Sequence, residues 1–191
     1  MRNSKGRRSR QRGGAEGRAP SAYVTLGDIL DIAKERGEAP LIILLDCVED
    51  PHNLGAVVRT AECAGAHGVV IPDRRAAPLG IGALRASAGA VDYLPVARVS
   101  SIPGALDQLK RDGIWTVAAD MGGRKPYYSY DFTGPTAIVI GGEDRGLGRL
   151  TKELCDDVAR IPMHGETPSL NASVSAAIMI YEAVRQRARK N

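Results

Sequence analysis

The chain has 191 residues, of which 43% are hydrophobic and 25% are charged. These proportions are those of an ordinary globular domain, and they exclude a wholly disordered chain, collagen and a coiled coil. The three cysteines, Cys47, Cys63 and Cys155, are too few and too scattered for a disulfide framework or a paired-thiol zinc site. A reducing cytoplasm is the simplest location for such a protein.

The net charge of +4 conceals two basic ends around a mildly acidic body. Residues 1–20 contain seven basic side chains and one acidic side chain, and residues 185–190 contain four basic ones. Because residues 1–21 include several glycines and few apolar side chains, we expect a basic, disordered tail there and one folded domain over 22–191. The tail can be a solvated linker or an arm that binds a polyanion. No signal peptide or membrane span is expected.

After the tail, the pattern alternates between helix and strand. Helices are expected over 25–37, 54–64, 79–88, 103–111 and 171–189, and strands over 41–46, 68–72, 93–96, 114–119, 136–141 and 158–162. The first strand is apolar up to Asp46, which is typical of a strand buried on both faces of a parallel sheet. The sequence therefore predicts an α/β fold with a mostly parallel, six-stranded sheet flanked by helices.

In such sheets, ligands collect beyond the carboxyl ends of the strands, and three polar loops are expected there. The loop over 50–59 has Asn53 at the position of a helix N-cap and Gly55, which lets a ligand approach the first turn. Helical side chains lean toward the N-terminus, so Arg59 can reach the same rim. This combination can bind a phosphate or carboxylate, and a capped helix with a surface arginine is the alternative.

The second loop, over 138–147, follows a strand directly with Gly141 and Gly142, and then with Glu143. It matches neither the dinucleotide-binding fingerprint nor a nucleoside-triphosphate loop. The two glycines could place bare backbone against a flat ligand, or they could form a tight turn.

The third loop, over 161–171, ends in Ser169, Leu170 and Asn171 at the start of the last helix. The two polar side chains could simply cap that helix. In an extended segment, Leu170 would point away from them.

Other constellations carry less chemistry. The three histidines, His52, His67 and His164, lack zinc-type spacing, so no metal is expected. Ser169 lacks the glycine-flanked elbow of a serine hydrolase. Cys63 lies in a predicted helix among alanines, and we interpret it as a core residue rather than a nucleophile. The aromatic residues between 127 and 132 either pack on the sheet edge or stack on RNA bases.

Taken together and in order, the three loops resemble the signature motifs of the SpoU (TrmH-like) RNA ribose methyltransferases. The resemblance covers about residues 23–187, nearly the whole folded part. It is carried by Asp50-Pro-His-Asn-Leu-Gly-x-x-x-Arg59, Gly141-x-Glu143-x-x-Gly146 and Ile161-Pro-Met…Ser169-Leu-Asn171-x-Ser173-Val. The stretches from Leu45 and from Tyr181 are most similar to the branch that methylates a guanosine of large-subunit ribosomal RNA.

This resemblance implies a SPOUT-type fold with a C-terminal trefoil knot, which periodicity does not show. It also implies a homodimer, an RNA substrate and S-adenosylmethionine as the methyl donor. Residues implied as cofactor contacts, through backbone and apolar groups, are Gly141, Gly142, Ile161, Met163, Leu170 and Ala119.

The implied reaction transfers a sulfonium methyl group to a ribose 2′-oxygen. The implied catalytic residues, some of them from the partner subunit, are Arg59, Asn53, Glu143, Ser169 and Asn171. Since arginine is essentially always protonated, we expect Arg59 to clamp a phosphate and stabilise the forming alkoxide. Glu143 is expected to fix its own loop and Arg59.

The expected target is a guanosine of 23S ribosomal RNA. Transfer RNA, an antibiotic-binding ribosomal site and a non-catalytic RNA-binding assembly factor on the same fold stay open as alternatives. The ribosomal branch usually carries an additional N-terminal RNA-binding domain, whereas a basic segment precedes the motifs here. Either that domain is missing from this chain, or the tail and the basic end near Arg185 bind the RNA.

Overall fold

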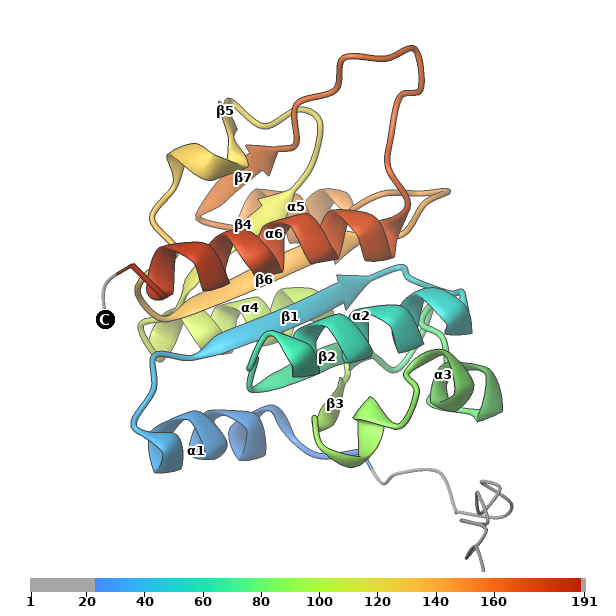
Figure 1. The fold of residues 1–191 in the computed structure, drawn as a ribbon, viewed down its shortest axis with the longest axis vertical. Coiled ribbons are helices and arrows are strands. Elements are labelled where there is room, and N and C mark those ends of the chain that lie inside the picture. Colours follow the sequence, from blue (N-terminus) through green and yellow to red (C-terminus); the bar gives the residue numbers. More distant parts are fainter. Residues whose placement is uncertain (1–22, 190–191) are drawn as a thin grey trace, which may run out of the picture.

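A computed structural model describes residues 23–189, so the tail expected over residues 1–21 lies outside the described residues. The described part is built on one seven-stranded sheet with the order β3-β2-β1-β6-β4-β7-β5 (Figure 1). Every neighbouring pair of strands is parallel. The predicted α/β architecture with a mostly parallel sheet is therefore confirmed.

Strands and helices alternate along most of the described residues, apart from β4, β5 and β6, which have no α-helix between them. The strands are β1 (Leu41–Asp46), β2 (Gly68–Pro72), β3 (Val96–Val99), β4 (Trp115–Ala119), β5 (Lys125–Pro126), β6 (Thr136–Gly141) and β7 (Asp157–Arg160). The helices are α1 (Leu26–Arg36), α2 (Pro51–Cys63), α3 (Ile81–Ala86), α4 (Ile102–Arg111), α5 (Arg149–Leu154) and α6 (Ala172–Arg187). Two 3-10 turns are η1 (Ala90–Asp92) and η2 (Tyr127–Ser129).

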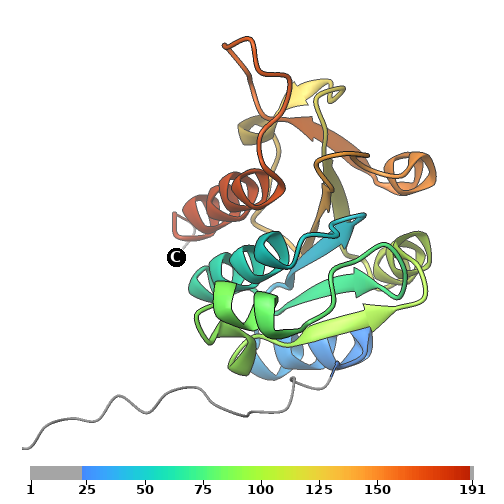
Figure 2. The same cartoon turned by 90° about the vertical axis from the view of Figure 1, so that its right-hand side faces the viewer.

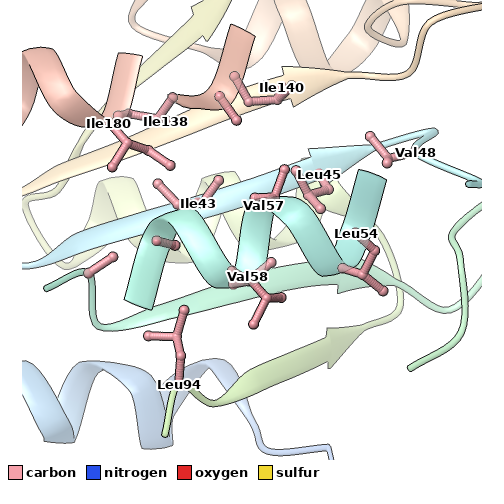
Figure 3. Close-up of a cluster of buried hydrophobic side chains, with 14 of the residues drawn as sticks. Ile43, Leu45, Val48, Leu54, Val57, Val58, Leu94, Ile138, Ile140 and Ile180 are labelled. Atoms are coloured by element: carbon pink, nitrogen blue, oxygen red, sulfur yellow. The ribbon is translucent and has the colours of Figure 1, made fainter. Parts of the chain in front are cut away.

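The central strand β1 is buried along its whole length, as its apolar sequence predicts. Its side chains alternate between two cores, because successive residues of a strand point to opposite faces. Ile43 and Leu45 belong to the core shared with α2 and α6, where Figure 3 shows them beside Val57 and Ile180. Ile42 belongs to the core shared with α1 and α4. Helices therefore cover both faces of the sheet, as Figure 2 also shows.

The third predicted strand is displaced. We expected a strand over 93–96, whereas β3 begins at Val96 and follows η1. Gly89 has a left-handed φ of 90° where it starts that turn, a conformation that glycine adopts without cost. Tyr93 is then 77% exposed, so its β-favouring side chain marks a loop rather than a strand.

Two helix boundaries and two short elements also differ from the prediction. α2 starts three residues earlier than expected, and α3 is shorter than 79–88 because Gly80 is its N-cap. The two-residue strand β5 and the six-residue helix α5 are too short for periodicity to indicate. Cys63 is exposed at the end of α2, so the expectation that it is a core residue is wrong.

The aromatic segment packs largely on the sheet. Phe132 is fully buried, and its ring lies 5.4 Å from that of Trp115, in an edge-on arrangement. The Tyr130 ring lies 5.8 Å from the Trp115 ring, and its hydroxyl donates to the carbonyl of Val158. Tyr128 is the exception, since it is 55% exposed.

Arg187, near the end of α6, ties that helix to the amino end of the sheet. Its guanidinium donates to the backbone carbonyls of Ala39, Pro40, Phe132 and Gly134 at 2.7–3.1 Å. Burial lowers the pKa of Arg187 from its usual value. Arg185 pairs with the buried carboxylate of Glu182. The guanidinium of Arg187 therefore faces inward, and RNA binding by the basic end near Arg185 stays a prediction for its other residues.

Replacing Arg187 by alanine should lower the free energy of unfolding by at least about 2 kcal/mol, because four carbonyls lose a charged donor. Urea unfolding followed by circular dichroism measures this change. Arg111→Ala is the matched control, since Arg111 is exposed and its side chain has no ion pair or hydrogen bond among residues 23–189. Its effect should stay within about 0.5 kcal/mol. Equal effects of the two substitutions would contradict the anchoring role of Arg187.

Candidate functional site

The polar loops after β6 and β7 open at the same edge of the sheet, because β4 lies in parallel between these two strands. They enclose a cavity of about 220 Å³, here called the first cavity. Figure 2 shows the loop after β7 extending away from the sheet and returning to α6. All residues expected to contact the cofactor line this cavity: Ala119, Gly141, Gly142, Ile161, Met163 and Leu170. Glu143 and Ser169 line it as well.

A hydrogen-bonded cluster joins the three loops. One carboxylate oxygen of Glu143 accepts from the side-chain amides of Asn53, at 2.8 Å, and Asn171. The amide of Asn171 also donates to Asn53 Oδ1 at 2.9 Å. Hydrogen bonds to a charged acceptor are stronger than neutral ones, and the buried Asn53 needs such partners. One side chain from each loop is thus held in place by the other two.

Two features of the first loop differ from the expectation. Asp50, not Asn53, is the N-cap of α2, because Pro51 fits the first helical position and Asp50 Oδ1 accepts from the His52 amide. Asn53 falls within the first turn and is free to bond Glu143. A Cβ on Gly55 would lie 2.5 Å from the carbonyl oxygen of Ala83, so this glycine permits the contact between α2 and α3 rather than ligand approach.

Asn171 caps α6, as expected for one of the two polar residues before that helix. Its Oδ1 accepts from the amides of Ser173 and Val174 at 2.9 and 3.2 Å. The same side chain therefore ends the third loop and binds Glu143 through its amide nitrogen. Ser169 is exposed where it lines the first cavity.

The glycines of the second loop are required by the packing of the chain on itself. A Cβ on Gly142 would lie 1.9 Å from the carbonyl oxygen of Cys47, and one on Gly141 would lie 2.5 Å from the peptide that joins Gly146 to Leu147. Gly142 also donates its amide to the backbone carbonyl of Asp46 at 2.9 Å. The tight-turn interpretation is therefore correct, although both glycines also line the first cavity.

Sequence reasoning missed Asp46, the buried last residue of β1. Its Oδ2 accepts from the amide of Gly148 at 2.9 Å, so it fixes the far end of the glycine loop. A carboxylate at the end of an otherwise apolar strand was the available signal. Leu147 and Ser175 also line the first cavity.

A second cavity of about 210 Å³ adjoins the first and shares Gly142 and Glu143 with it. Its lining is mostly acidic and polar. Its titratable residues are Cys47, Glu49, Asp50, Glu143, Asp144 and Arg145. Burial and the neighbouring Asp46 carboxylate raise the pKa of the Cys47 thiol, so this cysteine is unsuited to act as a nucleophile.

Arg59 is exposed on α2 and lines neither cavity. Within residues 23–189, the hydrogen bonds to Glu143 come from Asn53, Asn171 and Ala172. The expected contact between Glu143 and Arg59 is thus absent from the described part of one chain.

In the part of the chain that the structure describes, no three histidine, cysteine, aspartate or glutamate side chains are placed to hold a metal ion. None of the described helices has both the length and the apolar character needed to cross a membrane.

Residues 40–181 match the sequence profile of the SpoU rRNA Methylase family. The chain belongs to this family. YacO of Bacillus subtilis (strain 168), whose name places it in the TrmH family of tRNA/rRNA methyltransferases, is 46% identical over 165 residues, which are 86% of this chain and 66% of that protein. The 23S rRNA (guanosine-2′-O-)-methyltransferase RlmB of Photobacterium profundum is 45% identical over 158 residues, which are 83% of this chain and 64% of RlmB.

Solved methyltransferase structures have a similar fold. AviRb from Streptomyces viridochromogenes, in complex with AdoMet, superposes with a TM-score of 0.74 at 35% identity, over 78% of this chain and 58% of AviRb. An AdoMet-bound rRNA methyltransferase from Sinorhizobium meliloti gives 0.74 at 30% identity, over 86% and 61%. The expected family and its SpoU-type fold are confirmed, while the knot and the role of each residue stay predictions.

Gly142→Ala should destabilise the protein by about 2–3 kcal/mol, because the added methyl group collides with a backbone carbonyl that cannot move alone. Thermal and urea unfolding measure the loss. Gly134→Ala serves as the control, since a Cβ there meets nothing within 4 Å and φ is not left-handed. A Gly142→Ala protein as stable as the control would show that the loop does not need to approach Cys47 closely.

Proposed function

We propose that this chain transfers a methyl group from S-adenosylmethionine to a ribose 2′-hydroxyl of RNA. The observation that carries the proposal is the first cavity, which is lined by residues of the second and third loops. Beside it, the hydrogen-bonded cluster of Asn53, Glu143 and Asn171 connects these two loops to the first loop. The family supports the reaction, and the relatives named above support an RNA substrate.

The first cavity fits the chemistry of this cofactor. Its lining combines apolar side chains, such as Ile161, Met163 and Leu170, with the peptide groups of Gly141 and Gly142. Apolar surfaces suit a flat adenine, and peptide groups suit its polar edge. When bound, S-adenosylmethionine supplies an electrophilic methyl group on a sulfonium centre. Two AdoMet-bound methyltransferase structures, one of them the SpoU enzyme AviRb, have a similar fold and support this assignment.

In this proposal, Glu143 is a positioning residue. Its Oε1 accepts hydrogen bonds from Asn53 and Asn171. Its main effect is therefore to hold the first and third loops in place beside the two cavities. Accurate placement matters because a ribose hydroxyl is a poor nucleophile that must be aligned with the methyl group. Ser169, exposed in the same lining, can donate to or accept from the substrate.

The proposed target is a guanosine of 23S ribosomal RNA. The similarity to RlmB, a 23S rRNA guanosine-2′-O-methyltransferase, supports this target, and the similarity to YacO, named as a TrmH family tRNA/rRNA methyltransferase, keeps transfer RNA as a second candidate. This chain spans about two thirds of the length of these relatives. The rest of their length could contribute to RNA recognition, which leaves the methyl transfer itself as the function most directly tied to the described site.

The test incubates the chain with labelled S-adenosylmethionine and 23S ribosomal RNA, with transfer RNA in parallel, and maps the methylated nucleotide. We expect label on one ribose of 23S RNA. Glu143→Ala should lower the transfer rate by about 10²-fold, because misplaced groups lose alignment. Glu143→Gln keeps an acceptor oxygen for both amides, so its rate should stay within about tenfold of the wild-type rate.

If the Glu143→Gln rate is as low as the Glu143→Ala rate, the Glu143 carboxylate accepts the proton of the ribose 2′-hydroxyl and is not merely a positioning residue. Failure of the wild-type chain to bind S-adenosylmethionine in calorimetry would refute the proposed function. Label in transfer RNA alone would move the target without changing the chemistry.

The location of Arg59 supports a homodimer with shared sites. Val174, Ile178 and Tyr181 form a stripe on α6, in which Val174 and Tyr181 are 45% and 50% exposed. α2, which carries Arg59, packs beside α6 on the same face of the sheet (Figure 1). A second copy that covers this stripe would bury its apolar area. It would also allow the partner subunit's Arg59 to complete the site.

Co-expression of Arg59→Ala and Glu143→Ala chains tests this arrangement. If Arg59 acts across the interface, each mixed dimer has one site with both residues intact and one with neither. Random mixing should then restore roughly a quarter of wild-type activity, given that preparations of either variant alone are nearly inactive. No recovery, with mixed dimers verified by two affinity tags, would assign Arg59 to the site of its own chain.

A further inference from the structure

A third cavity at the carboxyl edge of the sheet is lined by arginines. It measures about 300 Å³ and lies where β1, β2 and β3 end, next to the start of α4 and α5. We call it the arginine cavity after three of its lining residues, Arg74, Arg75 and Arg149. Cys47 lines both this cavity and the acidic second cavity, so the two are neighbours.

The arginine cavity keeps a net positive charge, because two of its three arginines have no acidic partner in the described part of the chain. Among residues 23–189, the side chains of Arg74 and Arg75 form no ion pair and no hydrogen bond, and both residues are exposed. Asp46 is the one acidic residue in the lining, and its carboxylate oxygens already interact with the Gly148 amide and the Cys47 thiol. Arg149 pairs with Glu153 one turn along α5, at 3.1 Å.

The remaining lining suits an oxyanion. Ser100 and Ser101 contribute hydroxyl groups, and Ser101 is the N-cap of α4, where the helix dipole is positive. Arg75 has a left-handed φ of 58°, an uncommon conformation for an arginine. Guanidinium groups bind phosphate oxygens in a two-pronged geometry, so adjacent arginines with free charges are suited to a phosphodiester.

We infer that the arginine cavity binds a backbone phosphate of the RNA, beside the nucleotide that is methylated. This inference rests on the proposed function. A nucleotide at Glu143 brings its flanking phosphates to the same edge of the sheet, where the carboxylates of the second cavity repel them. The adjoining arginine cavity offers the opposite charge. The RNA backbone is therefore directed past Cys47 toward Arg74 and Arg75.

The test measures binding of the full chain to a fluorescent oligouridylate by anisotropy, over a range of potassium chloride concentrations and without cofactor. Phosphate contacts do not depend on base sequence, so this probe reports them directly. Arg74→Ala/Arg75→Ala should raise Kd about tenfold at low salt. It should also reduce the slope of log Kd against log salt by about 1.4, the value for two lost contacts on a single strand.

Arg36→Ala/Arg111→Ala is the matched control, because it removes the same charge from exposed helix ends away from this cavity. Arg74→Glu/Arg75→Glu should weaken binding further, and thermal unfolding verifies that each variant is folded. A Kd and slope equal to those of the control would overturn the inference, as would a wild-type chain that binds no RNA. Binding of inorganic phosphate with an unchanged RNA slope would also overturn it, since the cavity would then serve a small anion.

The two proposals fail in different ways. RNA binding that depends on Arg74 and Arg75, in a chain that does not bind S-adenosylmethionine, would refute the methyl-transfer function and support the phosphate site. If the chain transfers a methyl group to RNA but its RNA affinity does not depend on Arg74 and Arg75, the methyl-transfer function is supported and the phosphate site is refuted.

Discussion

The carboxylate of Glu143 is the point at which the candidate site is assembled. It joins Asn53 and Asn171, which lie ninety residues before it and 28 residues after it in the sequence. Asn53 lies in the first turn of α2, and Asn171 is the N-cap of α6. The Glu143 carboxylate therefore fixes the position of the start of both helices. Because Asn53 is buried, loss of the carboxylate would leave an amide without its partner, which is costly in a protein interior. The loops around the cavities are therefore stabilised as one unit.

The two ends of the sheet differ in what their polar groups do. At the carboxyl end, exposed acidic and basic side chains line cavities. At the amino end, the side chains of Arg187 and His67 form hydrogen bonds within the protein that stabilise the fold. The guanidinium of Arg187 donates to four backbone carbonyls. The buried ring of His67 accepts a hydrogen bond from the Leu41 amide and forms another with the Glu38 carboxylate. Burial lowers the pKa of His67, which keeps the ring neutral and able to accept.

The sequence predicts the parallel sheet because strands such as β1 are continuously apolar, and it locates the site because three polar loops follow strand ends. The residues of the first cavity came from the family resemblance rather than from periodicity. The start of α2 was predicted wrongly because two local signals compete. Asn53 is a favoured N-cap residue, but Pro51 fits the first helical position and Asp50 caps the helix three residues earlier. Asp46 and Arg187 act through contacts between distant segments, which one sequence does not reveal.

Because the ribosome synthesises the chain from its N-terminus, the parts of the site become available at different times. Among residues 23–189, α6 is the last helix, and it brings Arg187 together with its N-cap, Asn171. It also packs against β6 and α2, whose apolar sides lie in the same core. During translation, a nascent polypeptide that ends before α6 lacks one arm of the asparagine pair and leaves that core uncovered. Synthesis must therefore extend past α6 before the first cavity can form, so nascent chains that end earlier lack an assembled site.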